Sequence, residues 1–243
     1  MRMIIVVLAA LWSTAVNAKT IASINPCLDD WLLQWLPSTW QVLPTTEHQQ
    51  RLEAIVLSEP DVIVAGSFVN QQLLLALQDH AEILTLPYVS SMSDWRNAVR
   101  QLATELQAAS AAEQWLWQQQ QELQSYRLDD LGELLVLMPN SYTWGANSWV
   151  GQLLHTHGAR LSPIAGNGEL VRLQLEQLLA SEPDTVILEG FSQSYGRSQD
   201  WLWHDAVQHW LAQRHVVEVD GDIAGCADYR AVDYLYSITR GGD

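Results

Sequence analysis

The chain has 243 residues, a formal net charge of -16, and a single lysine, Lys19, among its 12 basic residues. Nucleic acids and anionic membrane surfaces attract cationic proteins, so this charge argues against both as partners. The 12 Trp residues are many for this length, and we expect them to pack the core or to line an apolar pocket.

Residues 1–18 have the pattern of a secretory signal peptide. Arg2 supplies a positive start, an almost unbroken apolar run follows, and Val16-Asn17-Ala18 ends in the small-x-small pattern of a cleavage site. We expect cleavage before Lys19 and export of a soluble chain to the periplasm. The alternative is a retained N-terminal anchor, although the apolar run is short for a membrane span.

Strands and helices alternate through the first half of the mature chain. Apolar, β-branched runs predict strands at 20–24, 62–64 and 83–86, with a short extended segment at 41–43. Apolar residues at helical spacing predict helices at 27–36, from Leu52 to Ser58, and at 69–78. Alternation of this kind is typical of α/β proteins with parallel sheets.

Residues 93–125 are rich in Ala, Gln, Glu and Leu and contain no Pro or Gly. This composition predicts one long helix, capped at its start by Ser91 or Ser93. The alternative is a break in the small-residue stretch around Ser110. A single rigid helix between two halves allows only modest opening and closing.

The second half repeats the alternation. Strands are expected at 134–138, 185–188 and 216–219, and helices at 148–157, from Leu175 to Ala180, at 203–212 and at 227–238.

One unit occurs in both halves in the same register. LEAIVLSEPDVIVAG begins at Leu52, and LEQLLASEPDTVILEG begins at Leu175. In each copy Pro ends a helix, Asp follows in the turn, and a strand that is apolar on both faces comes next. We therefore predict an α/β fold with two Rossmann-like lobes, each with a parallel sheet, joined by one long α-helix. The expected boundaries are 19–92 for the N-terminal lobe, 93–126 for the helix and 127–243 for the C-terminal lobe.

Ligands of open α/β sheets bind beyond the carboxyl ends of the strands, and this rule selects six loops. The loops are rich in aromatic, small and amide residues, which together suit a large and partly apolar ligand. For each aromatic residue alone, local packing is an equally good explanation. The candidate ligand-binding residues are Asn25, Pro26, Ser67, Phe68, Tyr88, Tyr142, Trp144, Phe191, Tyr195 and Arg230.

Cys27 and Cys226 are the two cysteines of the chain, and each is expected to follow a strand and to open a helix, one in either lobe. Two cysteines in an oxidising compartment predict a disulfide, which would link the lobes covalently near the base of the cleft. The alternative is two free thiols.

The order of these features resembles a known family. The signal peptide, IASINPCLDDWLLQWL, the repeated unit, the helical linker and NSYTWGANSWVGQLLHTHGA together resemble the periplasmic substrate-binding proteins of ABC importers. The class is the one that takes up vitamin B12 and iron-siderophores. The resemblance implies a monomer that holds a metal chelate, iron-siderophore or corrinoid-like, between two lobes and delivers it to a membrane permease. It implies no catalytic residue, no cofactor and no nucleic-acid partner.

The resemblance also implies that acidic residues near the top of each lobe dock to the permease. On the expected helix of the first lobe this chain has Gln71-Gln72 instead. The candidates that the sequence leaves open are Glu47, Asp79 and Glu82 on one lobe and Glu169 and Asp200 on the other.

Three other functions are alternatives to binding of a metal chelate. A zinc-type receptor needs three or four converging His or acidic ligands, but His155 and His157 face different ways on the expected helix. A secreted hydrolase lacks support, because there is no HExxH motif and residues 190–194 lack the second Gly of a nucleophile elbow. The adjacent Asp29 and Asp30 are better explained as stabilising a helix N-terminus. A nonenzymatic interaction module remains open.

Overall fold

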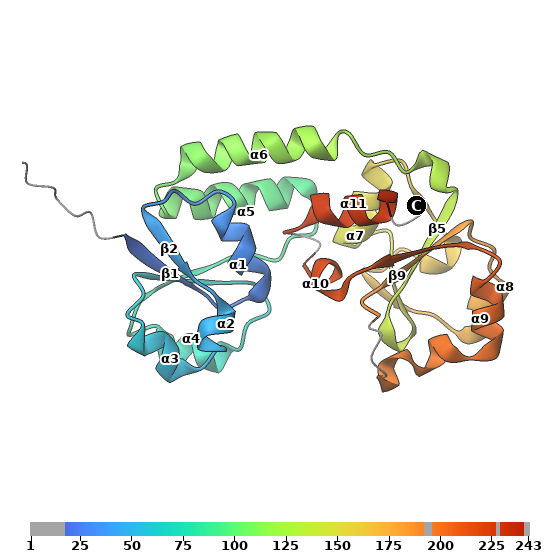
Figure 1. Ribbon diagram of the computed structural model, residues 1–243, viewed down its shortest axis with the longest axis horizontal. Coiled ribbons are helices and arrows are strands. Elements are labelled where there is room, and N and C mark those ends of the chain that lie inside the picture. Colours follow the sequence, from blue (N-terminus) through green and yellow to red (C-terminus); the bar gives the residue numbers. More distant parts are fainter. Residues whose placement is uncertain (1–17, 192–195, 227–228, 241–243) are drawn as a thin grey trace, which may run out of the picture.

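The computed structural model describes residues 18–191, 196–226 and 229–240. Two α/β lobes lie side by side, and a pair of helices, α5 and α6, runs along one side of the molecule (Figure 1). The two lobes with parallel sheets confirm the predicted fold class. In the part of the chain that the structure describes, no helix is long and apolar enough to cross a membrane.

The N-terminal lobe contains a parallel sheet with the strand order β2-β1-β3-β4. Its strands are β1 (Lys19–Ser23), β2 (Trp40–Leu43), β3 (Val62–Ala65) and β4 (Glu82–Thr85). Its helices are α1 (Pro26–Leu33), α2 (Thr45–His48), α3 (Leu52–Leu57) and α4 (Gln71–Leu77). Every residue of β3 is buried, as its apolar sequence predicts for a central parallel strand.

The C-terminal lobe has a second parallel sheet, with the order β10-β9-β5-β7. Its strands are β5 (Glu133–Leu137), β7 (Arg160–Leu161), β9 (Thr185–Glu189) and β10 (His215–Val219). A small antiparallel pair, β6 (Tyr142–Trp144) and β8 (Leu170–Arg172), lies beside this sheet. The helices are α7 (Trp149–Thr156), α8 (Leu175–Ala180), α9 (Asp205–Leu211), α10 (Gly221–Ala224) and α11 (Ala231–Arg240), with 3-10 turns at Asp129–Leu131, Pro139–Ser141, Pro163–Ala165 and Arg197–Trp203.

The repeated unit has the same structural role in both lobes. Asp61 precedes β3 and accepts a hydrogen bond from the backbone N–H of Thr20 at 2.7 Å. Asp184 precedes β9 and accepts from the backbone N–H of Glu133, also at 2.7 Å. Each Asp thereby joins the start of its own strand to the start of the neighbouring strand. This shared requirement explains why Ser-Glu-Pro-Asp occurs twice.

The prediction of one helix over 93–125 is wrong, because the segment forms the helices α5 (Met92–Glu105) and α6 (Ala109–Leu123). The chain turns at Gln107, whose φ is 55°, and the two helices form a hairpin. An ion pair of 2.6 Å between Arg100 and Glu113 joins them on the outside. Both helices bury apolar residues in one core, which a straight helix of this length could not do. The break lies just before the alternative site around Ser110, and α6 then leads to the C-terminal lobe (Figure 1).

The C-terminal end of the chain also differs from the prediction. The helix expected at 227–238 is observed as α10 and α11, so Cys226 follows a short helix rather than opening a long one. Residues 227–228 lie outside the described residues. The helix expected at 203–212 is α9, and Trp203 ends the 3-10 turn before it.

The largest hydrophobic core runs through both lobes. It includes one face of each sheet together with α1, α5, α6, α7 and α11. At its centre the ring of Trp31 makes edge contacts with Trp35, Trp115 and Tyr229, at centroid distances of 5.3, 5.9 and 5.3 Å. Because Trp31 belongs to α1 and Tyr229 to the C-terminal lobe, this aromatic cluster packs the two lobes against each other. Each lobe has one further, smaller core, which lies between its sheet and the helices on the other face.

Candidate ligand-binding site between the lobes

A cavity of about 520 Å³ lies between the lobes, at the carboxyl ends of strands from both sheets. Loops after β1, β3 and β4 line it on one side, and loops after β5, β9 and β10 line it on the other. Its lining is mainly apolar and aromatic, and its volume is in the ordinary range for small-molecule sites. The lining residues are Asn25, Cys27, Ser67, Phe68, Tyr88, Val89, Met138, Pro139, Trp144, Trp149, Val150, Glu189, Gly190, Gly221, Ala224, Gly225 and Tyr229.

The wall from the N-terminal lobe is aromatic and open to solvent. Phe68 is 87% exposed and packs edge-on against Tyr88, with ring centroids 5.6 Å apart. Asn25 supports this wall from below, because its side chain caps α1 by accepting a hydrogen bond from the backbone N–H of Cys27 at 3.0 Å. An exposed aromatic pair at the mouth of a cavity offers two faces for a planar or bulky ligand.

The wall from the C-terminal lobe contains a buried acid. Glu189 ends β9, is only 2% exposed, and accepts hydrogen bonds from Trp144 Nε1 and Tyr234 Oη, each at 2.7 Å. Burial raises the pKa of Glu189 from its ordinary value of 4.5 to about 7, although the two hydrogen bonds favour the ionised form. Burial and the nearby carboxyl also raise the pKa of Tyr234 well above its usual range. The cavity is therefore lined by a carboxyl group that changes charge near neutral pH.

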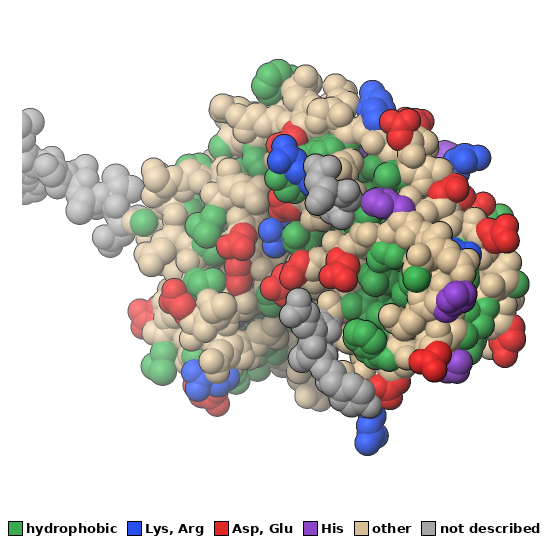
Figure 2. Space-filling view, turned by 45° about the vertical axis from the view of Figure 1, so that its right-hand side comes forward, with side chains coloured by type: hydrophobic (Ala, Val, Ile, Leu, Met, Phe, Trp, Pro, Cys, Tyr) green, Lys and Arg blue, Asp and Glu red, His purple; other side chains and the backbone are tan. Residues whose placement is uncertain are grey.

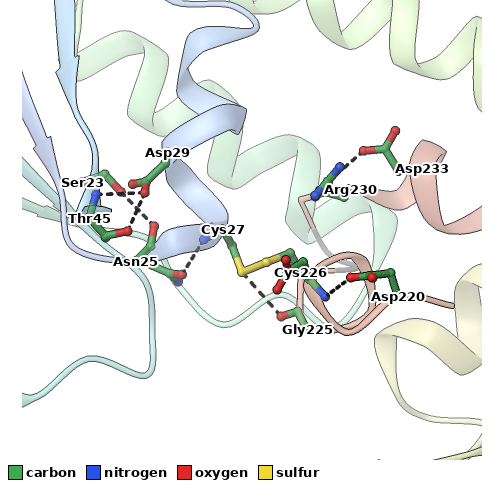
Figure 3. The surroundings of a disulfide bond; sticks show 11 residues. Ser23, Asn25, Cys27, Asp29, Thr45, Asp220, Gly225, Cys226, Arg230 and Asp233 are labelled. Atoms are coloured by element: carbon green, nitrogen blue, oxygen red, sulfur yellow. Dashed lines mark hydrogen bonds and ion pairs between the residues drawn. A yellow bond between two sulfur atoms is a disulfide. The ribbon is translucent and has the colours of Figure 1, made fainter. Parts of the chain in front are cut away.

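A disulfide forms the base of the cavity. Cys27 in α1 is bonded to Cys226, with Cα atoms 5.3 Å apart, which confirms the predicted bridge (Figure 3). The bond joins one lobe to the other across 199 residues of sequence. At the mouth, Tyr88 Oη donates a hydrogen bond of 3.3 Å to Glu169 on the opposite lobe. These contacts and the shared aromatic core hold the lobes together on several sides of the cavity.

The structure brings five of the ten predicted binding residues into this cavity: Asn25, Ser67, Phe68, Tyr88 and Trp144. Pro26 and Arg230 line an adjoining hollow that shares the disulfide, and Arg230 is paired there with Asp233 at 2.8 Å (Figure 3). Tyr142 pairs with Arg172 in the antiparallel β6–β8 pair and does not line the cavity. Phe191 makes an edge contact with Trp201, with ring centroids 6.1 Å apart, and lines a separate hollow of the C-terminal lobe. Tyr195 lies outside the described residues.

Several lining residues were not among the predicted ones. Met138, Pro139, Trp149 and Val150 surround Trp144, and their apolar side chains resemble core residues in the sequence. The sequence could have indicated Glu189 as a site residue. A charged residue at the end of an otherwise apolar strand, just before Gly190, is unusual for a central parallel strand.

Other candidate residues are not part of the cavity lining. The five proposed permease-docking acids, Glu47, Asp79, Glu82, Glu169 and Asp200, are all exposed. His157 is buried, and burial lowers its pKa. His48 is buried against the backbone carbonyl of Ser23 at 2.8 Å. Within residues 18–191, 196–226 and 229–240, no group of three or more His, Cys, Asp or Glu side chains is arranged to hold a metal ion.

Residues 41–220 match the periplasmic binding protein family. The chain belongs to that family. Membership implies a small-molecule ligand, an ABC permease as partner and a binding role rather than an enzymatic one, which removes the support for a hydrolase. No curated protein matches the chain in sequence.

Solved structures share the fold of this periplasmic binding protein. The periplasmic heme binding protein HutB of Vibrio cholerae is 16% identical, with a TM-score of 0.68 over 92% of this chain and 99% of that chain. A periplasmic heme binding protein from Pseudomonas aeruginosa is 15% identical, with a TM-score of 0.62 over 91% and 92%. The siderophore binding protein BauB, solved with two molecules of acinetobactin and ferric iron, is 12% identical, with a TM-score of 0.64 over 93% of each chain. At such identities these likenesses show a common fold.

Proposed function

We propose that this periplasmic binding protein captures a metal chelate, iron-siderophore or corrinoid-like, in the interlobe cavity and delivers it to the permease of an ABC importer. The observation that carries the proposal is the cavity itself, which faces both sheets at their carboxyl ends and is lined by aromatic side chains from both lobes. Aromatic walls of this kind bind large, partly apolar ligands through contact area and stacking. The names of the structural relatives, which include heme and siderophore binding proteins, agree with a chelate of this type.

The arrangement of the lobes supports capture without a large hinge motion. The disulfide, the Trp31–Tyr229 contact and the helical hairpin connect the lobes on the closed side of the cavity. A ligand would enter from the open side, where Phe68 and Tyr88 are exposed. We expect the lobes to move little on binding, since each connection would have to break for wide opening.

Two parts of the proposal concern the chain outside the cavity. We propose that residues 1–18 are a signal peptide cleaved before Lys19, which N-terminal sequencing of the periplasmic protein would test. We also propose that the protein is a monomer and that exposed acids on both lobes dock to the permease. The candidates are Glu47, Asp79 and Glu82 on one lobe and Glu169 and Asp200 on the other.

A titration of intrinsic Trp fluorescence tests the proposed function. Hemin, cyanocobalamin and ferrioxamine B would be added separately to the chelator-stripped protein, with glucose, glutamine and Zn²⁺ as controls. At least one chelate should quench the fluorescence and raise the melting temperature, because Trp144 and Trp149 line the cavity. Response to a control alone would contradict the proposal, and a response to Zn²⁺ would favour a bare-metal receptor.

A further inference from the structure

We propose that the interlobe cavity selects its ligand by charge, accepting an uncharged or cationic chelate and rejecting an anionic one, and that Glu189 is the residue that sets this preference. The inference rests on the proposed function and narrows its substrate class. It follows from two features of the cavity: the described lining contains no basic side chain, and the carboxyl group of Glu189 is fixed in one wall.

The lining contains no Lys, Arg or His among the residues that the structure describes. Arg230 belongs to the adjoining hollow, and its charge is already paired with Asp233. The internal segments outside the description, 192–195 and 227–228, have the sequences Ser-Gln-Ser-Tyr and Ala-Asp, so neither can supply a basic side chain. Figure 2 shows both acidic and basic side chains near the junction of the two lobes on the face that it presents. An anionic ligand would therefore lose hydration without gaining a cationic partner.

Glu189 adds a negative group to this lining. Both of its carboxyl oxygens are held, one by Trp144 and the other by Tyr234, so the group is fixed at the wall rather than free to turn away. The residue is buried in the protein, where charges interact more strongly than in water. Because burial brings its pKa to about 7, the group is mainly ionised at pH 8. An anionic ligand group facing it would be repelled, whereas a cationic group or a hydrogen-bond donor would be attracted.

A purely structural role for Glu189 makes a different prediction. If its carboxyl only ties β6 and α11 to β9, replacement by Gln keeps the shape and leaves ligand preference unchanged. Gln can accept from Trp144 through its oxygen and donate to the hydroxyl oxygen of Tyr234 through its amide group. Glu189→Gln therefore separates charge from shape.

The experiment uses ligands that differ in charge and share a core. Ferrioxamine B carries a pendant ammonium group, its N-acetyl derivative is uncharged at that position, and its N-succinyl derivative carries a carboxylate there. Cyanocobalamin and its monocarboxylic acid form a second matched pair. Dissociation constants would be measured at pH 8 by Trp fluorescence and calorimetry for the wild-type protein and for Glu189→Gln. Glu176→Gln, which removes an exposed carboxyl from α8, away from the cavity, is the matched control.

For whichever core binds, the wild-type protein should hold the uncharged member about tenfold more tightly than the anionic member. Glu189→Gln should reduce this ratio to about threefold or less, whereas Glu176→Gln should leave it unchanged, because an exposed charge far from the cavity is screened by solvent. If the anionic member binds as tightly as the uncharged one, or if the ratio survives in Glu189→Gln, the inference is wrong while the proposed function stands. If hemin, whose propionates are anionic, binds while no member of either series does, the inference is wrong and the proposed function stands. If hemin and both series all fail to bind, the proposed function fails and the inference fails with it.

A second variant guards against misfolding of Glu189→Gln. Ser67 lines the cavity from the opposite lobe and is half-buried, so Ser67→Arg would place a cation in the lining without disturbing β9. It should raise affinity for the anionic member at least fivefold relative to the uncharged member, by adding an attractive charge within the same cavity. An equal change for both members would contradict selection by charge.

Discussion

The two lobes begin their central strands alike and end them differently. Asp61 and Asp184 bind the neighbouring strand in the same way, so the start of the repeated strand is constrained by the fold. At the other end, β3 leads into Gly66, whereas β9 ends in Glu189 before Gly190. A Cβ atom at Gly66 would lie 2.4 Å from the side-chain nitrogen of Asn25, so any other residue there would displace the Asn25 side chain. The duplicated unit is therefore shared where it builds the sheet and diverges at the carboxyl ends of the strands, next to the interlobe cavity.

The largest expected effect comes from separating the lobes at the disulfide. The double variant Cys27→Ser with Cys226→Ser should lose about 5 kcal/mol of unfolding free energy, because the bridge constrains a loop of 199 residues in the unfolded chain. Urea unfolding with and without reductant measures this loss, and reductant should have no effect on the double variant. Two reactive thiols in the denatured, unreduced wild-type protein would contradict the bridge.

The second largest effect is expected in the pH dependence of stability, which Glu189 in the C-terminal lobe should influence. The pKa of Glu189 is raised from 4.5 to about 7 in the folded protein, so folding favours the protonated form. Ionising Glu189 therefore lowers the free energy of unfolding. This loss of stability is absent below the pKa of the unfolded chain and grows as pH rises from about 4.5 to 7. Above that window it is complete, at about 3 kcal/mol. Glu189→Gln should remove this part of the pH dependence.

Urea unfolding of the wild-type protein and Glu189→Gln between pH 5 and pH 8 measures the difference between them. The variant should gain stability relative to the wild-type protein as pH rises. A constant difference across this range would show that Glu189 has an ordinary pKa.

A smaller effect is expected at the corresponding position of the N-terminal lobe. Gly66→Ala would push the Asn25 side chain away from the start of α1, and loss of this cap costs about 1 kcal/mol. Gly196→Ala is the control, since the nearest atom to its Cβ is at an ordinary 3.7 Å. Thermal unfolding of both variants checks this expectation, and equal melting temperatures would mean that Asn25 relaxes without cost.

The smallest change is expected at the exposed aromatic wall. Phe68→Ala should weaken binding of the chelate by roughly fivefold to tenfold, in line with about 1 kcal/mol for one aromatic contact. Stability should be unchanged, because Phe68 is 87% exposed. Trp117→Ala removes another exposed aromatic residue, from α6, and should leave affinity unchanged. Equal affinity of both variants and the wild-type protein would exclude Phe68 from the site.

The sequence predicted those features that depend on local pattern. The repeated helix and strand, the cysteine pair and the aromatic loops around Phe68 and Trp144 each leave a signal in a few neighbouring residues. The α5–α6 hairpin left none, because the residues around Gln107 have good helix propensity and the turn is imposed by packing of both helices on one core. Four of the ten predicted site residues lie outside the cavity lining for a related reason, because the direction of a side chain also depends on tertiary packing: Pro26, Tyr142, Phe191 and Arg230.

Loop membership does not reveal which way a side chain points. Tyr142 follows β5 as expected, but it belongs to the strand β6, which pairs with β8, and Phe191 turns toward Trp201. Glu189 could be located at the end of a strand from the sequence, yet its hydrogen bond with Tyr234 joins residues 45 positions apart and depends on tertiary structure.

The central claim is that each lobe supplies one wall of a single chelate site. Hydrogen–deuterium exchange would be measured on the wild-type protein with and without the tightest-binding member of the ferrioxamine and corrinoid series. We predict that one equivalent of ligand protects backbone amides at 66–68 and 88–89 in the N-terminal lobe and at 189–190 and 221–225 in the C-terminal lobe. Stoichiometric binding that protects amides of only one lobe would contradict the account.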